Sequence, residues 1–459
     1  MIRTLYSLAT WAAQPLLVAK LRRRGAAEPG YLQAVDERFG HYSVARPEGD
    51  GPLVWIHAVS LGETRAAAIL LAALRARLPG MRLLLTHGTA TGRAEGSKLL
   101  HAGDVQVWQP WDTRGAVRRF LAQFRPDVGV LMETEIWPNL IHEARARGVP
   151  LALANGRLSE KSLRGARRAG GLLRPAYRAL SAVWAQTESD AARFRALGAP
   201  QVSVLGNLKF DADPDAAQQA QGARWGAALG GRPVVMLASS REGEETEFLE
   251  RIEPPVAVGQ AQTAIKNEAD GRASPLWLIV PRHPQRFAEV AGLARAAGWR
   301  VAQRSAWQAE LPPDALAAEL WIGDSLGEMA LYYSLADVAL LGGSFAPLGG
   351  QNLIEAAACG CPVVMGPHTF NFAQAAELAE AAGAALRVPD LAAALAAAQA
   401  LLGDGARLAA ARQAASAFAQ AHRGAAARTA DALAGLLAAH HGGLPARQGL
   451  APSRPDAQA

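Results

Sequence analysis

The sequence predicts an α/β fold with two parallel, doubly wound sheets. From about residue 52, short apolar runs alternate with segments of helical periodicity, which favours parallel strands joined by helical crossovers. The strands are apolar throughout, as expected when helices cover both faces of a sheet. The alternation stops at Gly206–Asp211 and restarts at Pro233, so the 459 residues predict two Rossmann-like domains. We expect these domains to face each other across a cleft.

The first predicted domain covers residues 31–206. Its strands are expected at Leu53–His57, Arg82–Thr86, Asp104–Trp108, Asp127–Met132, Pro150–Ala154, Ala182–Ala185 and Val202–Leu205. Helical patterns separate them, including Thr64–Arg77, Arg114–Phe124 and Ser189–Leu197. After this domain, and before the strands of the second one, a polar helix is expected from Ala212 to Ala228.

The second predicted domain covers residues 207–440. Its strands are expected at Pro233–Ala238, Leu276–Val280, Trp299–Ala302, Leu320–Ile322, Val338–Leu341 and Pro362–Met365. The polar segment from Pro254 to Ser274 predicts a surface insertion, and alanine-rich helices are expected after Phe372. Residues 441–459 have the composition of a disordered tail.

The N-terminal residues 1–30 resemble a membrane-binding segment. Thr4–Ala19 carries no charge and is followed at once by Lys20 and Arg22–Arg24. The run is shorter than the ~20 residues that span a bilayer, and Pro15 interrupts it. We expect a short anchor or interfacial helix whose basic flank stays at the cytoplasmic face. A buried helix and a cleaved leader are the alternatives.

The charge of the chain indicates anionic partners. The formal net charge is +6, and the stretch from Arg157 to Arg178 is strongly basic. That stretch is either a solvated helical face or a surface for an acidic membrane or phosphorylated lipid. Aromatic residues make up only 6% of the chain and do not alternate with basic residues, which argues against nucleic acid.

Few residues suggest a metal or a cofactor. The two cysteines, Cys359 and Cys361, are expected to be small buried hydrophobic residues in a reducing compartment. The Asp211-Ala-Asp213 pair resembles a magnesium motif but lies in the linker, so we interpret it as structural. No G-x-G-x-x-G motif follows the first strand, which argues against a dinucleotide oxidoreductase. We therefore predict no metal and no cofactor.

Two acidic segments follow strands of the first domain. Ser60, Gly62 and Glu63 form a loop and helix start after the first strand. Glu63 is either a helix-capping carboxylate or a general base for a substrate hydroxyl. Glu133 and Glu135 follow the fourth strand, where they are either polar edge residues or part of the acceptor side of the cleft.

Four loops of the second domain are candidates for binding an anionic nucleotide. Arginine and helix-starting loops at strand ends suit phosphate or carboxylate groups. The candidate residues are Ser240 and Arg241 after one strand, Pro281 and Arg282 after the next, Leu326, Gly327 and Glu328 in a third loop, and Asn352, Leu353, Ile354 and Glu355 after a glycine-rich loop.

Nine motifs, in one order, resemble the Kdo (3-deoxy-D-manno-octulosonic acid) transferases of lipopolysaccharide synthesis. They are WIHAVSLGE, METEIWPN, NGRLSEKS, AQTESD, GNLKFD, SREGEE, VPRHP, GDSLGEM and GGSFAPLGGQNLIEA. The likeness extends from about Tyr31 to the helices past Asn371.

This resemblance implies a GT-B glycosyltransferase that moves Kdo from CMP-Kdo to a lipid A precursor, lipid IV-A. It also implies an inverting, metal-independent reaction at the cytoplasmic face of the bacterial inner membrane, with an N-terminal membrane anchor. Carried over by motif, Glu63 is the proton acceptor. The CMP-contacting positions are Pro281, Arg282, Leu326, Gly327, Glu328, Asn352, Leu353, Ile354 and Glu355, and the role of Arg241 is the least well defined.

Two other functions remain open from the residues alone. One is a different GT-B transferase or an epimerase that uses a UDP-sugar. The other is a non-catalytic membrane adaptor that keeps the fold and binds anionic lipid.

Overall fold

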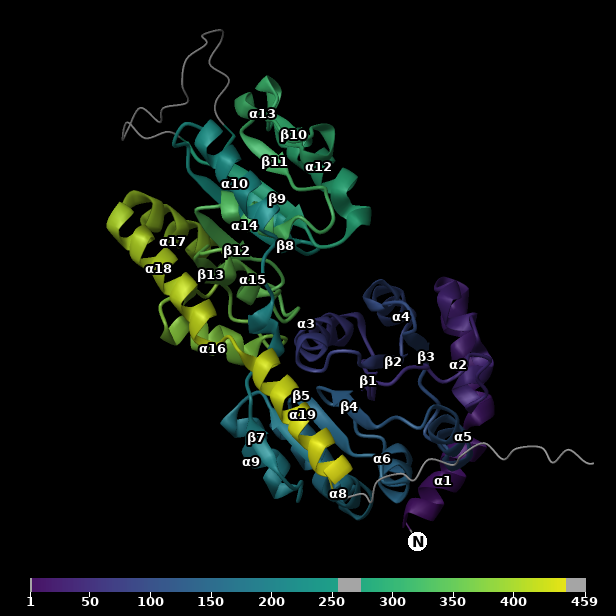
Figure 1. Ribbon diagram of the computed structural model, residues 1–459. Helices are drawn as coiled ribbons and strands as arrows, with labels where there is room; N and C mark the ends of the chain where they lie inside the picture. Colours follow the sequence, from purple (N-terminus) through teal and green to yellow (C-terminus); the bar gives the residue numbers. More distant parts are fainter. Residues whose placement is uncertain (1, 255–273, 443–459) are drawn as a thin grey trace, which may run out of the picture. The chain divides into compact units, whose positions relative to one another are not determined.

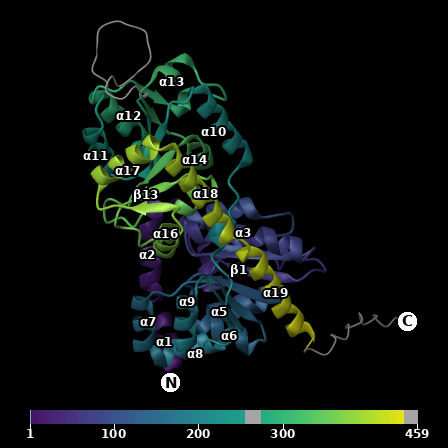
Figure 2. The same cartoon turned by 90° about the vertical axis from the view of Figure 1, so that its left-hand side faces the viewer.

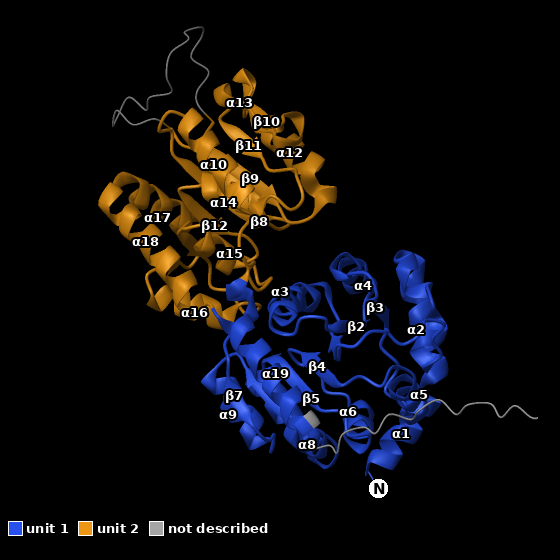
Figure 3. Cartoon of the chain, viewed as in Figure 1, with its two compact units in different colours: residues 1–211, 424–459 blue, residues 212–423 orange. Residues whose placement is uncertain are grey.

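A computed structural model describes residues 2–254 and 274–442 of the chain. It divides into two compact units, with unit 1 formed by residues 1–211 and 424–459 and unit 2 by residues 212–423 (Figure 3). The predicted insertion from Pro254 to Ser274 and the predicted tail lie almost wholly outside the described residues.

Unit 1 contains, in its described residues, a seven-stranded sheet in the order β3-β2-β1-β4-β5-β6-β7 (Figure 1). All neighbouring strands are parallel. The strands are β1 (Leu53–His57), β2 (Arg82–His87), β3 (Val105–Trp108), β4 (Val128–Met132), β5 (Leu151–Gly156), β6 (Ala182–Ala185) and β7 (Val202–Val204). The strand order reverses direction between β1 and β4, so this is the topological switch point where such sheets bind ligands.

Helices cover both faces of this sheet. They are α1 (Ile2–Ala12), α2 (Gln14–Ala27), α3 (Leu61–Arg77), α4 (Ala90–Gly96), α5 (Arg114–Phe124), α6 (Pro138–Ala146), α7 (Glu160–Arg168), α8 (Gly170–Ala179), α9 (Glu188–Ala196) and α19 (Ala425–Gly442), with 3₁₀ turns at Pro29–Leu32, Val35–Phe39, Ser97–Leu99 and Leu208–Asp211. Leu53 and Trp55 of β1 pack into one core, and Val54 and Ile56 pack into the other. This two-sided burial explains why the strands are continuously apolar.

The last helix, α19, belongs to unit 1. It contacts α3, and Ala425, Ala430 and Leu433 join the same core as β1 (Figure 2). Asp211 caps α19, because its carboxylate accepts hydrogen bonds from the backbone N–H groups of Gly424 and Ala426, both at 2.5 Å. The predicted domains 31–206 and 207–440 therefore need correction: the boundary falls after Asp211, and the chain returns to unit 1 at Gly424.

Unit 2 contains a second seven-stranded parallel sheet in its described residues, in the order β10-β11-β9-β8-β12-β13-β14. The strands are β8 (Val234–Ser240), β9 (Leu276–Pro281), β10 (Val301–Gln303), β11 (Leu320–Ile322), β12 (Val338–Leu341), β13 (Val363–Met365) and β14 (Ala385–Arg387). Its switch point lies between β8 and β12. Strand β14 is absent from the sequence prediction because its three residues lie in an alanine-rich segment.

The helices of unit 2 are mostly short. They are α10 (Ala216–Ala228), α11 (Glu244–Arg251), α12 (Phe287–Ala296), α13 (Pro313–Ala317), α14 (Met329–Leu335), α15 (Leu353–Ala358), α16 (Ala373–Ala381), α17 (Leu391–Gly403) and α18 (Gly405–Ala421), with 3₁₀ turns at Pro284–Arg286 and Arg304–Ala306. Cys361 is buried and Cys359 half-buried, and both are free thiols. The prediction of two doubly wound α/β sheets is confirmed for both units.

The N-terminal segment folds as the two helices α1 and α2. None of the helices among the described residues combines the length and apolar character that crossing a bilayer requires.

Candidate functional site

The acidic residues predicted in unit 1 lie at its switch point. Strands β1 and β4 pair in parallel with His57 opposite Leu131, so the segments after them leave the sheet at the same edge. Ser60, Gly62 and Glu63 follow β1, while Glu133 and Glu135 follow β4. The structure therefore brings both predicted acidic segments together.

Glu63 is held by the loop that precedes its own helix. Ser60 is the N-cap of α3 and accepts a hydrogen bond from the Glu63 N–H at 3.4 Å. In return, the Glu63 carboxylate accepts from the Ser60 hydroxyl at 2.9 Å and from the Val59 N–H at 2.9 Å. This reciprocal pattern is close to a capping box. The capping and catalytic interpretations of Glu63 are therefore compatible, because the hydrogen bonds that cap α3 also hold the carboxylate in a fixed position.

Burial raises the pKa of Glu63 to about 7. The negative charges of Glu135 and Glu133 raise it further, while the hydrogen bonds from Val59 and Ser60 oppose the shift. A carboxylate with a pKa near neutrality is suited to accept a proton and release it again. Gly62 is exposed in the first turn of α3.

Glu133 and Glu135 have different surroundings. Glu133 is buried with φ of 54°, and its carboxylate lies 3.4 Å from Lys209 Nζ and 3.8 Å from an Arg157 Nη. Glu135 accepts a hydrogen bond from the Trp137 indole N–H at 2.7 Å. Burial raises the pKa of Glu135, and the charge of Glu133 raises it further.

His57, the last residue of β1, was not predicted from the sequence. It is fully buried, and its Nε2 lies 3.9 Å from an oxygen of Glu135. Burial lowers the pKa of His57 to about 3, with a further lowering from His87. In the sequence, the only signal for His57 is that a polar side chain ends an apolar strand.

In unit 2, the candidate loops after β8, β9, β11 and β12 leave one edge of the parallel sheet. The Arg282 N–H donates to the Ser240 carbonyl at 3.0 Å, and Arg282 Nε donates to Gln351 at 3.2 Å. Gly342 could not carry a side chain, because a Cβ would lie 2.5 Å from the Ser239 carbonyl oxygen. These contacts join the loops that start at Ser240, Pro281 and Gly342.

Several positive groups gather in these loops. Burial lowers the pKa of His283, and the charges of Arg241 and Arg282 lower it further, so both guanidinium groups act on this imidazole. Arg282 is exposed, and Arg241 is half-buried beside the glycine-rich loop. The cluster can attract a phosphate or carboxylate group.

Ser240 lies inside unit 2 rather than on its surface. Its side chain is fully buried, and its hydroxyl donates to Glu245 at 2.9 Å. Glu245 in turn lies 3.2 Å from Arg286. The Ser240 side chain therefore holds the loop that carries Arg241.

The remaining donor-site candidates differ in exposure and in their side-chain contacts. Glu328 pairs with Arg304 at 2.8 Å and also accepts from Ser325, whereas Leu326 is 72% exposed. Gly327 has φ of 81°. The side chains of Pro281, Leu353 and Ile354 are buried. Asn352 caps α15 by accepting from the Ile354 N–H at 3.1 Å, and Glu355 is half-buried.

Sequence reasoning also missed a segment that supports the glycine-rich loop. The side-chain amide of Asn371 donates to the Leu348 carbonyl at 3.0 Å, and its N–H donates to Gly349. Phe370 is 60% exposed beside Gly349. In the sequence, the only feature that could have pointed to Phe370 and Asn371 is their position in the segment after a predicted strand.

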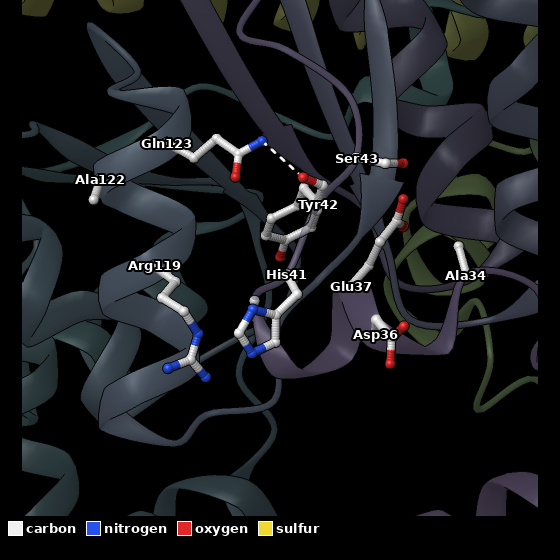
Figure 4. A pocket seen from close by; sticks show the side chains of 10 residues that line it. Ala34, Asp36, Glu37, His41, Tyr42, Ser43, Arg119, Ala122 and Gln123 are labelled. Carbon is white, nitrogen blue, oxygen red and sulfur yellow. Dashed lines mark hydrogen bonds between the residues drawn. The ribbon is translucent and has the colours of Figure 1, made fainter.

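A pocket of about 800 Å³ in unit 1 does not coincide with the predicted residues. It lies between α5 and the segment 34–43, where Gln123 donates to the Tyr42 carbonyl at 3.2 Å (Figure 4). A second pocket, of about 550 Å³, is lined by Leu8 and Trp11 of α1 and by Arg114. None of the candidate residues lines either pocket. Across residues 2–254 and 274–442, no three His, Cys, Asp or Glu side chains are arranged to hold a metal ion.

The chain is similar to proteins of known activity. It is 48% identical over 437 residues to the 3-deoxy-D-manno-octulosonic acid transferase of Bordetella pertussis, covering 94% of this chain and 98% of that protein. It is 31% identical over 381 residues to the protein of the same name from Haemophilus influenzae, covering 81% and 84%. The family model described as 3-Deoxy-D-manno-octulosonic-acid transferase (kdotransferase) matches residues 33–212.

Solved structures agree with the fold. A glycosyltransferase from Rickettsia africae has a TM-score of 0.54 at 11% identity, covering 86% of this chain and 100% of that one. The UDP-GlcNAc 2-epimerase of Neisseria meningitidis has a TM-score of 0.51 at 13% identity, covering 84% and 99%. At these identities the likeness concerns the fold alone. With the sequence relatives, it follows that this chain belongs to the Kdo transferase family and is a glycosyltransferase of the GT-B type.

Proposed function

We propose that the protein transfers Kdo from CMP-Kdo to a lipid A precursor, lipid IV-A, with inversion at the anomeric carbon. Glu63 supports this proposal most strongly, because it places a carboxylate with a pKa of about 7 at the switch point of unit 1. The glutamate occupies the motif position at which the family resemblance implies a proton acceptor. In this proposal the base comes from unit 1 and the donor-binding loops come from unit 2.

In the proposed reaction, the Glu63 carboxylate takes the proton of an acceptor hydroxyl as that oxygen attacks the anomeric carbon of Kdo. The new carbon–oxygen bond forms on the face opposite the bond to CMP, which breaks. CMP leaves with the bonding electron pair, and the proton remains on Glu63 until it passes to solvent. A single displacement of this kind inverts the anomeric configuration.

Unit 2 is proposed to bind the donor through charge. CMP-Kdo carries a phosphodiester and a carboxylate, and Arg241 and Arg282 lie in adjoining loops beside His283. Charge-assisted hydrogen bonds from these groups stabilise the negative charge that develops on the leaving CMP.

The donor assignment is tested by thermal shift with CMP and UDP. We expect CMP to raise the melting temperature, because ligand that binds only the folded state adds to stability by mass action. UDP at the same concentration is expected to give a much smaller shift. The reverse order would favour a UDP-sugar enzyme, and no shift with either nucleotide would favour a non-catalytic adaptor.

We also propose that α1 docks the enzyme on the cytoplasmic face of the bacterial inner membrane. Ile2, Leu5, Leu8 and Trp11 of α1 are between 53% and 66% exposed. The helix is held to unit 1 by hydrogen bonds from Tyr6 to Asp112 and from Ser7 to Asn139, both at 2.9 Å. An exposed apolar helix followed by Lys20 and Arg22–Arg24 suits an anionic lipid surface.

Membrane docking predicts that the double variant Leu5→Ser, Trp11→Ser binds vesicles about tenfold or more weakly than the wild type, because each exposed apolar side chain contributes burial in lipid. Co-sedimentation with vesicles containing anionic phospholipid measures this. Leu386→Ser is a matched control, since Leu386 is 45% exposed on β14 in unit 2. Equal binding by all three proteins would exclude α1 as the docking element.

A further inference from the structure

The two acidic residues after β4 differ in how their charge is compensated. Glu133 has two cations nearby, Lys209 at 3.4 Å and Arg157 at 3.8 Å. Glu135 accepts a hydrogen bond from Trp137 and lies 3.9 Å from His57 Nε2. Within the described residues, no lysine or arginine forms an ion pair with Glu135. Its negative charge is therefore the less compensated of the two.

His57 does not neutralise Glu135. His57 Nδ1 lies 2.9 Å from the Thr86 hydroxyl and 3.1 Å from the Thr86 carbonyl oxygen, so strand β2 holds the ring through this nitrogen. His57 Nε2 is buried without a hydrogen-bond partner in the described structure. Burial lowers the pKa of His57 to about 3, so the ring is neutral at physiological pH. Glu135 thus faces a neutral ring fixed in place by strand β2.

We propose that Glu135 is a positioning residue that acts through Glu63. In this view, the charge of Glu135, fixed by the Trp137 indole and left uncompensated by neutral His57, sets how strongly Glu63 holds the proton it takes from the acceptor hydroxyl. The inference rests on the proposed role of Glu63 as the base. It assigns separate roles to the two acidic segments at the switch point. Glu63 accepts the proton, and the charge of Glu135 determines how strongly Glu63 binds it.

The groups around Glu63 agree with this assignment. Burial is the largest cause of the raised pKa of Glu63, and the charge of Glu135 contributes more than that of Glu133. Hydrogen bonds from the Val59 N–H and the Ser60 hydroxyl, which belong to the same loop, lower the pKa of Glu63 and so oppose the effects of burial and of the two carboxylates. His87 on β2 is also neutral, because burial lowers its pKa to about 4. Removing the charge of Glu135 favours the ionised form of Glu63 and therefore lowers the pKa of Glu63.

The test is the pH dependence of kcat/KM for Kdo transfer in the wild type, Glu135→Gln and Glu135→Asp. We expect the acid limb of the wild type near pH 7, where Glu63 titrates. In Glu135→Gln the limb moves to lower pH, and the plateau falls by about threefold because the base is weaker. The amide oxygen of the introduced glutamine can still accept a hydrogen bond from the Trp137 indole N–H, so the side chain is expected to keep its position. Glu135→Asp keeps the charge, and its limb stays close to that of the wild type.

Each outcome has a distinct meaning. An acid limb that is unchanged in Glu135→Gln overturns the inference, and so does an Asp variant whose limb moves as far as that of the Gln variant. Failure of the proposed function is recognised separately, in the wild type and in Glu63→Gln. If Glu63→Gln retains full transfer, Glu63 is not the base, whatever Glu135 does. Melting curves of all variants show whether each one is folded.

Discussion

Replacement of Glu63 by glutamine is expected to lower kcat for Kdo transfer by about 10²- to 10⁴-fold, the usual contribution of a general base. The amide cannot take the proton of the acceptor hydroxyl. It can still accept a hydrogen bond from the Val59 N–H and donate one to the Ser60 hydroxyl, which are the two groups that hold the carboxylate. The loop and the start of α3 should therefore keep their structure, and CMP affinity should change by less than about twofold.

Transfer kinetics and a CMP titration of the same preparation check this result. Glu188→Gln is the matched control, since Glu188 also lies in the first turn of a helix after a strand but is exposed and pairs only with Arg195 in the described structure. Loss of CMP affinity or a fall in melting temperature in Glu63→Gln, but not in Glu188→Gln, would assign a structural role to Glu63.

Replacement of Arg282 by alanine is expected to raise the dissociation constant for CMP-Kdo by about tenfold to a hundredfold. A hydrogen bond to a charged group contributes about 1.5–3 kcal/mol, and Arg282 is an exposed guanidinium beside the donor loops. Its backbone N–H still bonds to Ser240, so the turn after β9 should persist.

Titration with CMP-Kdo or CMP measures this change. Arg295→Ala is the control, because Arg295 is an exposed arginine at the end of α12 that bonds to Gln303. An unchanged donor titration in Arg282→Ala would exclude a direct role for this residue. An equal loss in Arg295→Ala would point instead to the general positive charge of unit 2.

The limits of several strands were predicted well from the sequence because they are continuous apolar runs bounded by clear turn signals. Leu53–His57, Ala182–Ala185 and Val338–Leu341 have the predicted limits, because continuous apolar runs in a doubly wound sheet leave little ambiguity. The assignment of α19 failed for a different reason. An alanine-rich helix carries the same local pattern whichever unit it packs on, and only the contacts of Leu433 with the core of β1 decide between them.

Candidate site residues could be predicted where their side chains belong to a recognisable sequence motif. The Ser60-x-x-Glu63 spacing indicated both a cap and a base, and the structure shows the capping hydrogen bonds. His57 could not be found in this way, because its importance comes from burial and from its distance to Glu135, which lies 78 positions further along the chain. Ser240 is predicted from the sequence as a possible contact to the donor phosphate or carboxylate, because the sequence does not show that its hydroxyl turns inward to Glu245.

The most direct measurement is mass spectrometry of lipid IV-A after incubation with the enzyme and CMP-Kdo generated in the reaction. We expect the wild type to yield lipid that carries Kdo, and Glu63→Gln to form this product about 10²- to 10⁴-fold more slowly while still binding CMP. A folded wild-type enzyme that binds CMP but leaves the lipid unmodified would exclude Kdo transfer to lipid IV-A. A Glu63→Gln variant that modifies the lipid at the wild-type rate would exclude Glu63 as the general base.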